Sequence, residues 1–171
     1  RVMMDYVCSI LDSVCGGGFR NILLFNSHGG NQGIGQVILE DFGAAHPDCR
    51  IAMVTWWTLA QDALAELSKT GRFGTGHACE FETSLMMAAG AIEPNIDLPT
   101  GEFFVPSHGW ADSSMLHKSV GALYRSIRQI SGGSGVIGRP DAATLEQGHK
   151  ITMAVVRRLE TVVTDLRQMG Q

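Results

Sequence analysis

The sequence is poor in the features that mark several functional classes. Only 18% of its 171 residues are charged, and 13 Lys and Arg stand against 17 Asp and Glu, which gives a formal net charge of −4. No basic stripe or cluster is present, so we expect no nucleic-acid partner. No apolar run approaches the ~20 residues that a helix needs to cross a bilayer, so we expect no membrane partner either.

Cysteines are also few, and their spacing carries no motif. The four lie at Cys8, Cys15, Cys49 and Cys79, without a Cys-x-x-Cys pair of the kind found in zinc or redox sites. Cys8 and Cys15 are seven residues apart on one expected helix, too far along its axis for a disulfide. We therefore predict reduced, mostly buried thiols in a cytoplasmic enzyme.

Helical and strand patterns alternate along the chain. Apolar residues at Val2, Tyr6, Ile10 and Val14 recur every four positions, which predicts an amphipathic helix that ends at three glycines, 16–18. The remaining helices are expected at 31–46, 58–68, 79–89, partly within 113–130, and after Pro140 with Asp141 as N-cap; strands are expected at 21–25, 51–55 and 136–137. This alternation predicts an α/β fold with a mainly parallel sheet.

The segment that follows the first expected strand is a candidate ligand site. The strand is short, apolar and continuous, as in a central parallel strand, and His28, Gly29 and Gly30 come after it. Open α/β sheets bind ligands at the carboxyl ends of their strands, where a neutral imidazole can hold a metal. A simple turn with a surface histidine explains this local pattern equally well.

Two motifs together resemble the creatininase (creatinine amidohydrolase) family. They are N-S-H-G-G-N-Q at 26–32 and G-H-A-C-E-F-E-T-S-L-M-M at 76–87, and Trp56-Trp57 and G-V-I-G-R-P at 135–140 agree further. The resemblance implies a three-layer α/β fold and a metal-dependent amidohydrolase that cleaves a cyclic or non-peptide C–N amide bond. It also implies two divalent metal ions (Zn, Mn or Fe), a small-molecule amide substrate and a homo-oligomer, a hexamer.

The family's amino-terminal metal motif, Glu-x-His-Gly-x-His followed by Thr-Asp, has no match in this sequence. We therefore expect a single α/β domain over residues 1–171 that is incomplete at its amino terminus. Such a chain would hold only half of an active site.

The resemblance also assigns roles to residues near the first motif. It implies that His28 binds metal and that Gly29, Gly30, Asn31, Trp56 and Trp57 bind substrate. In creatininase itself a glutamate stands where this chain has Gly30, which favours the wider family over true creatinine hydrolysis. Core packing is the alternative for at least one of the two tryptophans.

The second motif supplies the expected acid/base groups. The resemblance implies that His77 transfers a proton and that Glu80 is a metal ligand or an acid/base group. Residues two apart on a helix point about 200° from one another, so only one of Glu80 and Glu82 should face the site. Both carboxylates could instead simply stabilise a helix start. Cys79 as a nucleophile is the weaker alternative, and His108 and His117 are left to surface or subunit contacts.

Two other function classes compete with the hydrolase. A glycine-rich turn between a strand and a helix is also typical of Rossmann-like nucleotide binding, although the turn lacks the G-x-G-x-x-G pattern and no acidic residue ends the next strand at Thr55. A metal-free structural or regulatory subunit derived from the hydrolase is the other alternative.

Overall fold

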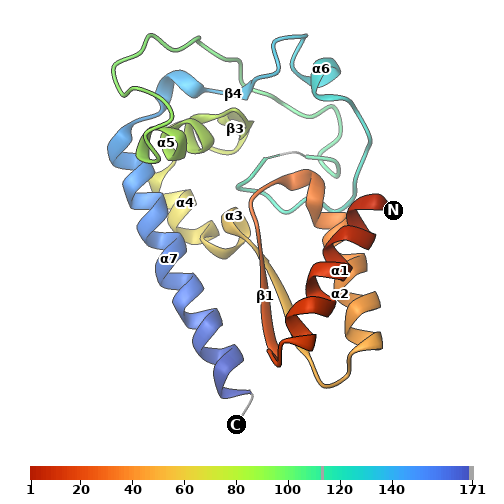
Figure 1. Ribbon diagram of the computed structural model, residues 1–171. Helices are drawn as coiled ribbons and strands as arrows, with labels where there is room; N and C mark the ends of the chain where they lie inside the picture. The colour runs from red at the N-terminus through yellow and green to blue at the C-terminus, as the bar shows by residue number, and fades with distance from the viewer. Residues whose placement is uncertain (113, 170–171) are drawn as a thin grey trace. The chain divides into compact units, whose positions relative to one another are not determined.

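A computed structural model describes residues 1–112 and 114–169. These residues divide into two compact units, Arg1–Leu59 with Arg157–Gln171, and Ala60–Val156. Figure 1 shows the elements of both units in chain order. No helix in the described part of the chain has the length and apolarity that a membrane span requires.

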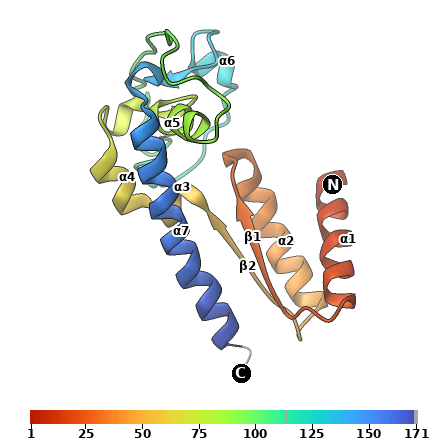
Figure 2. The same cartoon turned by 60° about the vertical axis from the view of Figure 1, so that its left-hand side comes forward.

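The first unit is built on one parallel strand pair. Strand β1 (Asn21–Asn26) pairs in register with β2 (Arg50–Thr55), so that Asn26 lies opposite Thr55. Helices α1 (Val2–Gly16) and α2 (Gln32–Ala45) lie on the same side of this pair (Figures 1 and 2). The short helix α3 (Trp56–Leu59) follows β2 directly, at the end of the pair where β1 also stops.

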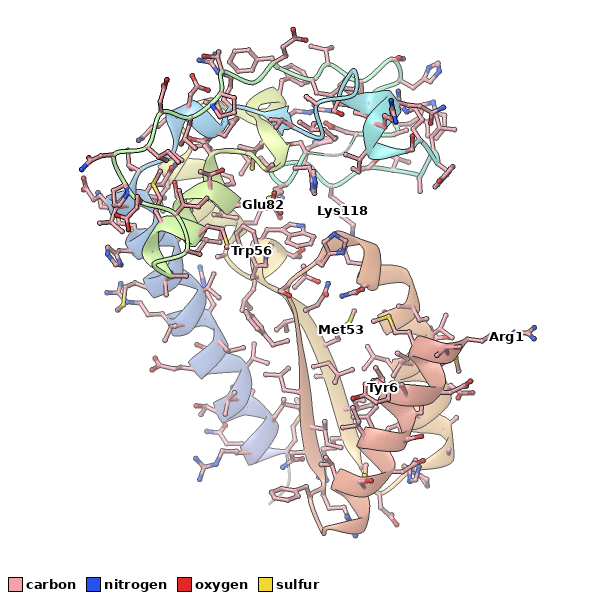
Figure 3. The ribbon with its side chains drawn as sticks, turned by 45° about the horizontal axis from the view of Figure 1, so that its top comes forward. Arg1, Tyr6, Met53, Trp56, Glu82 and Lys118 are labelled. Atoms are coloured by element: carbon pink, nitrogen blue, oxygen red, sulfur yellow. A yellow bond between two sulfur atoms is a disulfide. The ribbon has the colours of Figure 1, made fainter. Side chains whose placement is uncertain are left out.

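The core of this unit lies between the helices and the strands. Its buried members come from α1, α2 and β1: Leu11, Cys15, Ile22, Ile38 and Phe42. Met53 points from β2 toward α2 (Figure 3), and a Cβ atom at Gly35 would overlap the Met53 sulfur. Gly35 therefore lets α2 approach the strands closely.

The cysteines of the first unit differ from the expectation. Cys15 at the end of α1 and Cys49 before β2 are joined as a disulfide. The prediction of four reduced thiols is therefore wrong for this pair, while Cys8 and Cys79 are free. The two residues are 34 positions apart, and only the packing of α1 against the β2 entry brings them together.

The second unit has more turns and shorter elements. Its helices are α4 (Gln61–Leu67), α5 (Glu80–Ala88), α6 (Ile127–Ile130) and the first part of α7 (Leu145–Gln168); its strands are β3 (Thr75–His77) and β4 (Ile137–Gly138), with 3-10 turns at Arg72–Gly74 and Pro140–Ala142. β3 and β4 pair antiparallel. Helix α7 packs tightly on α5: a Cβ atom at Gly148 would overlap the backbone carbonyl of Ser84, so only glycine allows this close approach.

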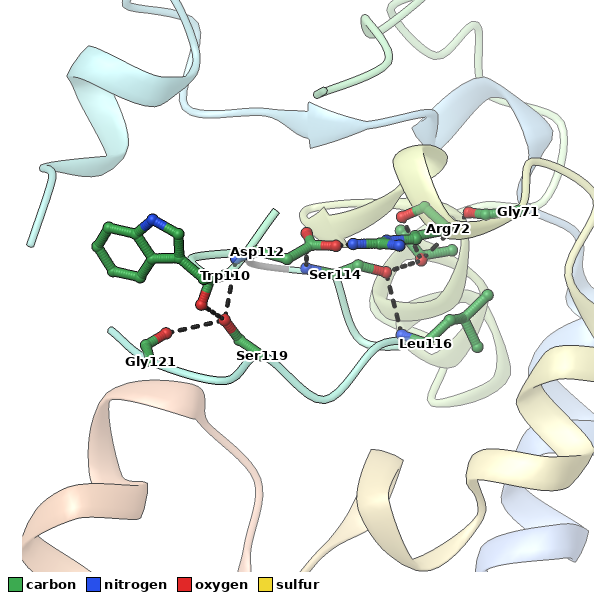
Figure 4. A network of polar contacts seen from close by, with 9 residues as sticks. Gly71, Arg72, Trp110, Asp112, Ser114, Leu116, Ser119 and Gly121 are labelled. Atoms are coloured by element: carbon green, nitrogen blue, oxygen red, sulfur yellow. Dashed lines mark hydrogen bonds and ion pairs between the residues drawn. The ribbon is translucent and has the colours of Figure 1, made fainter. Parts of the chain in front are cut away.

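A polar network fixes a loop of this unit to the start of β3 (Figure 4). The Arg72 guanidinium lies 2.6 Å from the Asp112 carboxylate, whose side chain is only 1% exposed. Asp112 also accepts the Ser114 N–H at 2.9 Å, and its own N–H donates to the Ser119 hydroxyl at 3.0 Å. The described residues on either side of Asp112 form no helix or strand, so these bonds satisfy buried polar groups of the loop.

The α/β class is confirmed, the mainly parallel sheet is confirmed in part, and several expectations for single elements are wrong. The described residues form one parallel and one antiparallel pair, where a mainly parallel sheet was predicted. The helix expected at 58–68 is interrupted at Ala60, and helix within 113–130 is found only in α6, with Ser113 outside the described residues. Asp141 does not cap α7; it lies in a 3-10 turn and binds Arg139 at 2.6 Å. The Thr144 hydroxyl takes the capping position instead, accepting the Gln147 N–H at 3.2 Å.

Candidate active site

The carboxyl ends of β1 and β2 gather the residues of the first motif. The Asn26 amide donates to the Thr55 hydroxyl at 3.1 Å, and this buried bond ties the last residues of the two strands together. The Asn26 side-chain oxygen then accepts the His28 N–H at 3.2 Å, which fixes the chain as it leaves β1. This end of a parallel pair is where α/β proteins place ligands.

His28 is exposed and caps the 3-10 turn Gly29–Asn31. Its Nδ1 atom accepts the Gly30 N–H at 3.2 Å. A neutral imidazole that accepts at Nδ1 carries its proton on Nε2. Histidines that bind a metal through Nε2 carry their proton on Nδ1 and donate it to another group. If His28 bound a metal in this way, Nδ1 could no longer accept the Gly30 N–H.

The lack of a side chain at Gly30 leaves room for the His28 ring in this arrangement. A Cβ atom at this position would lie 3.0 Å from Cε1 and 3.1 Å from Nδ1 of His28. A side chain here would therefore displace the His28 imidazole, which now accepts the Gly30 N–H.

The two tryptophans have different surroundings. Trp56 is only 6% exposed, as the core-packing alternative expects, and its ring meets that of Trp57 edge to face with 5.5 Å between centroids. Trp57 is half-buried, and its ring lies 3.7 Å from a Cβ atom placed on Gly29. Of the expected substrate-binding residues, Trp57 and Gly29 are thus brought together at the strand ends.

In the second unit, His77 stands between two backbone irregularities. Thr75 pairs with Gly138 and His77 with Ile137, so Gly76 is an extra residue, a β-bulge. Ala78, on the other side, has φ of 51° and is the one non-glycine residue with positive φ in the described part of the chain. The His77 side chain itself is half-buried.

The two glutamates of α5 lie on opposite flanks, as expected from their spacing. Glu80 is 0% exposed, and its carboxylate accepts bonds from the Ser68 and Thr70 hydroxyls at 2.7 and 2.8 Å. The Lys69 and Thr70 N–H groups donate to it as well, as does the Gln147 amide at 3.1 Å. These donors occupy the acceptor capacity of both carboxylate oxygens.

Glu82 has a single hydrogen bond among those found and is half-buried. Its Oε2 atom accepts the Ala78 N–H, so the Glu82 side chain reaches back across the start of α5. A glutamate at the third helical position commonly accepts the N–H of the capping residue. Here the donor is shifted by one residue, from the N-cap Cys79 to Ala78, the residue with positive φ that precedes the cap.

Cys79 is buried and has the pKa of an unreactive thiol. Burial raises the pKa of the Cys79 thiol to about 11, while the backbone N–H groups of Glu82 and Phe81 act in the opposite direction. The thiolate is the nucleophilic form, so the thiol is inert at neutral pH. The alternative of Cys79 as the nucleophile finds no support in this environment.

Several partners of these residues carry no signal in the sequence. Gln147 on α7 is hydrogen-bonded to both Glu80 and Ser84, which lie 67 and 63 positions before it in the sequence. Ser68 and Thr70 belong to a loop with no motif of its own. His108 stacks on Trp110 with 5.7 Å between ring centroids and remains exposed.

The described residues supply few ligands for a metal. No group of three or more His, Cys, Asp or Glu side chains within 1–112 and 114–169 could hold an ion. His28 fits as a single ligand if its ring turns away from Gly30, whereas Glu80 already has a full set of protein donors. A two-ion site would need ligands beyond those that are described.

Comparisons with known proteins agree with the motifs. Three solved creatininase structures share the fold: a tryptophan-to-phenylalanine mutant (16% identity, TM-score 0.68), a glutamate-to-glutamine mutant of the Zn-Zn type (20%, 0.66) and a second tryptophan-to-phenylalanine mutant, Type II (17%, 0.69). Each comparison covers 96% of this chain and 63% of the other, so this chain spans less than two thirds of their length. No curated protein sequence matches it. The family model of creatinine amidohydrolase matches residues 1–163, and the chain therefore belongs to the creatininase family.

Proposed function

We propose that the complete protein is a metal-dependent amidohydrolase that cleaves a cyclic or non-peptide C–N amide bond of a small molecule. The observation that carries this proposal is the convergence of His28, Gly29 and Trp57 at the carboxyl ends of a parallel strand pair, in a chain of this family. An exposed imidazole beside a flat aromatic wall suits a small planar substrate.

The metal enters as part of the proposal. One relative is described as of the Zn-Zn type, and we propose two divalent ions, Zn, Mn or Fe, with His28 as one ligand. When bound, such ions lower the pKa of water and polarise a carbonyl. The remaining ligands would come from outside the described residues, as would further strands that complete a three-layer, mainly parallel sheet around β1 and β2.

His77 is proposed to transfer a proton to the leaving nitrogen, work that suits an imidazole. Glu80 was the expected ligand or acid/base partner, but its buried, fully bonded carboxylate favours a structural role. We propose that Glu80 holds the 68–70 loop and α7 against the start of α5. Trp57, Gly29, Gly30 and Asn31 remain the proposed substrate contacts, with Trp56 behind them in the core.

A metal-free structural or regulatory subunit is the second candidate. The hydrogen bond from the Gly30 N–H to Nδ1 of His28 favours it, because in a metal-binding histidine the ring nitrogen that is not bound to metal usually donates its own N–H to a partner. Nucleotide binding is less well supported. The Gly30 and Asn31 N–H groups already bond to His28, so they are not free for phosphate.

Metal content and turnover of the full-length protein test the proposal. We expect stoichiometric transition metal after mild purification and hydrolysis of at least one compound in a panel of cyclic and linear amides. His28→Ala should remove at least one ion while the fold remains, and Asn21→Ala, at the opposite end of β1, should remove none. Full metal retention in the His28 variant would mean that His28 only caps its turn; absence of metal in the wild type would support the regulatory subunit.

A further inference from the structure

The segment that leads from β3 into α5 contains the one non-glycine residue with positive φ in the described part of the chain. A β-bulge at Gly76 and a left-handed Ala78 lie on either side of His77. Bulges redirect side chains and are common beside active sites. Non-glycine residues in the left-handed region persist only where their surroundings hold them there.

The bulge is held by close packing against β4. A Cβ atom at Gly76 would lie 2.7 Å from Cγ2 and 3.0 Å from the carbonyl oxygen of Ile137. A Cβ atom at Gly138 would overlap the Gly74 carbonyl and lie 3.0 Å from the Cys79 Cβ. The two glycines therefore let β3 and β4 pack closely at the bulge, directly before His77.

Packing of this kind does not explain Ala78, because alanine has a Cβ atom and no glycine-like freedom. The contact that does is the bond from the Ala78 N–H to Oε2 of Glu82. Glu82 lies on α5, a helix of 9 residues whose first turn also carries the buried Glu80 and Phe81. The carboxylate is thus attached to a rigid element and reaches back to the strained residue.

We propose that Glu82 is a positioning residue: its carboxylate holds Ala78 in the left-handed conformation and so sets the direction of the His77 side chain. The inference rests on the proposed function for the role of His77 in proton transfer. It gives Glu82 a task that Glu80 cannot perform, because the Glu80 carboxylate is occupied on the opposite flank. A charge-assisted bond to a backbone N–H is stronger than a neutral one, which suits a contact that must oppose strain.

The test is a double-mutant cycle in the full-length protein, with Glu82→Ala, Ala78→Gly and the two combined. Glycine adopts positive φ without strain, so the loss of thermal midpoint caused by Glu82→Ala should shrink to less than half when Ala78→Gly is present. Glu66→Ala, at an exposed acid of α4, should show no such coupling to Ala78→Gly.

Two further readouts separate positioning from general stability. In Glu82→Ala the ring signals of His77 in NMR spectra should move, and in the double variant they should return toward their wild-type positions. Turnover of Glu82→Ala should fall roughly 10–100-fold with KM within about twofold, and the double variant should regain part of it. Additive midpoints together with unmoved His77 signals would overturn the proposal. If coupling and signals behave as expected while His77→Ala keeps full turnover, the positioning role stands and the proton-transfer role fails.

Discussion

At the scale of single residues, Glu80 gives the sharpest prediction. Glu80→Gln replaces one acceptor oxygen with an NH₂ group that faces the hydroxyl and N–H donors of Ser68, Lys69 and Thr70. Buried donors would then lack an acceptor, so the free energy of unfolding should fall by about 2–4 kcal/mol. Urea denaturation would measure the loss.

The control for this change is Glu66→Gln, at an exposed position of α4, which should alter the free energy of unfolding by less than ~0.5 kcal/mol. Metal content of the Glu80→Gln protein decides between the two roles of Glu80. A variant that keeps its fold stability but loses metal would contradict the structural role and restore the ligand role.

The buried thiol of Cys79 predicts a pH dependence. Its folded pKa, about 11, lies above the ordinary value of 9.0, so between these two pH values the unfolded chain releases a proton that the folded chain retains. Stability should therefore fall as pH rises from 9 to 11. Cys79→Ser removes this group and should flatten that part of the curve; an unchanged slope would show that Cys79 is not the cause. In the wild type at pH ~8, iodoacetamide should label Cys79 only after unfolding.

Residue-scale features were predictable where they depend on local geometry. The opposite flanks of Glu80 and Glu82 follow from 3.6 residues per helical turn, and the structure confirms this separation. Which flank is buried depends on Gln147, 67 positions away, and no local pattern reports such a partner. For the same reason the disulfide between Cys15 and Cys49 could not be deduced from the spacing of four cysteines.

At the scale of elements, the close crossing of α5 and α7 predicts that a residue with a higher helix propensity lowers the stability of the protein. Alanine is the better helix former by about 1 kcal/mol, yet Gly148→Ala should lower the free energy of unfolding by about 1–3 kcal/mol, because its Cβ would overlap the Ser84 carbonyl. Gly33→Ala in α2 is the matched control: nothing lies within 4 Å of its Cβ position, so that change should be neutral or stabilising. Equal effects of the two substitutions in thermal unfolding would contradict the close crossing.

Most long elements followed from the sequence, and of the short strands only β4 was expected, at 136–137. α1, α2, α5, β1 and β2 lie where periodicity and turn residues predicted them. β3 has three residues and β4 has two, too few to show a period of two, so their antiparallel pairing was missed. The break at Ala60 likewise has no glycine or proline that would mark it in the sequence.

At the scale of the whole molecule, we predict that the full-length protein is a homo-oligomer, a hexamer by its family. Several apolar side chains are unusually exposed in the chain as described, among them Val2 (83%), Tyr6 (68%), Val120 (89%) and Tyr124 (91%). We expect some of these side chains to be covered by other subunits in the assembled protein. Light scattering at micromolar concentration should give a mass several times that of one chain.

Tyr6→Lys and Tyr124→Lys then report which region takes part in the subunit contacts. A charge buried at such a contact should lower the mass of the assembly, whereas Glu66→Lys on exposed α4 should not. A monomeric wild type would contradict the prediction outright, and a mass insensitive to both tyrosine variants would place the subunit contacts on other surfaces.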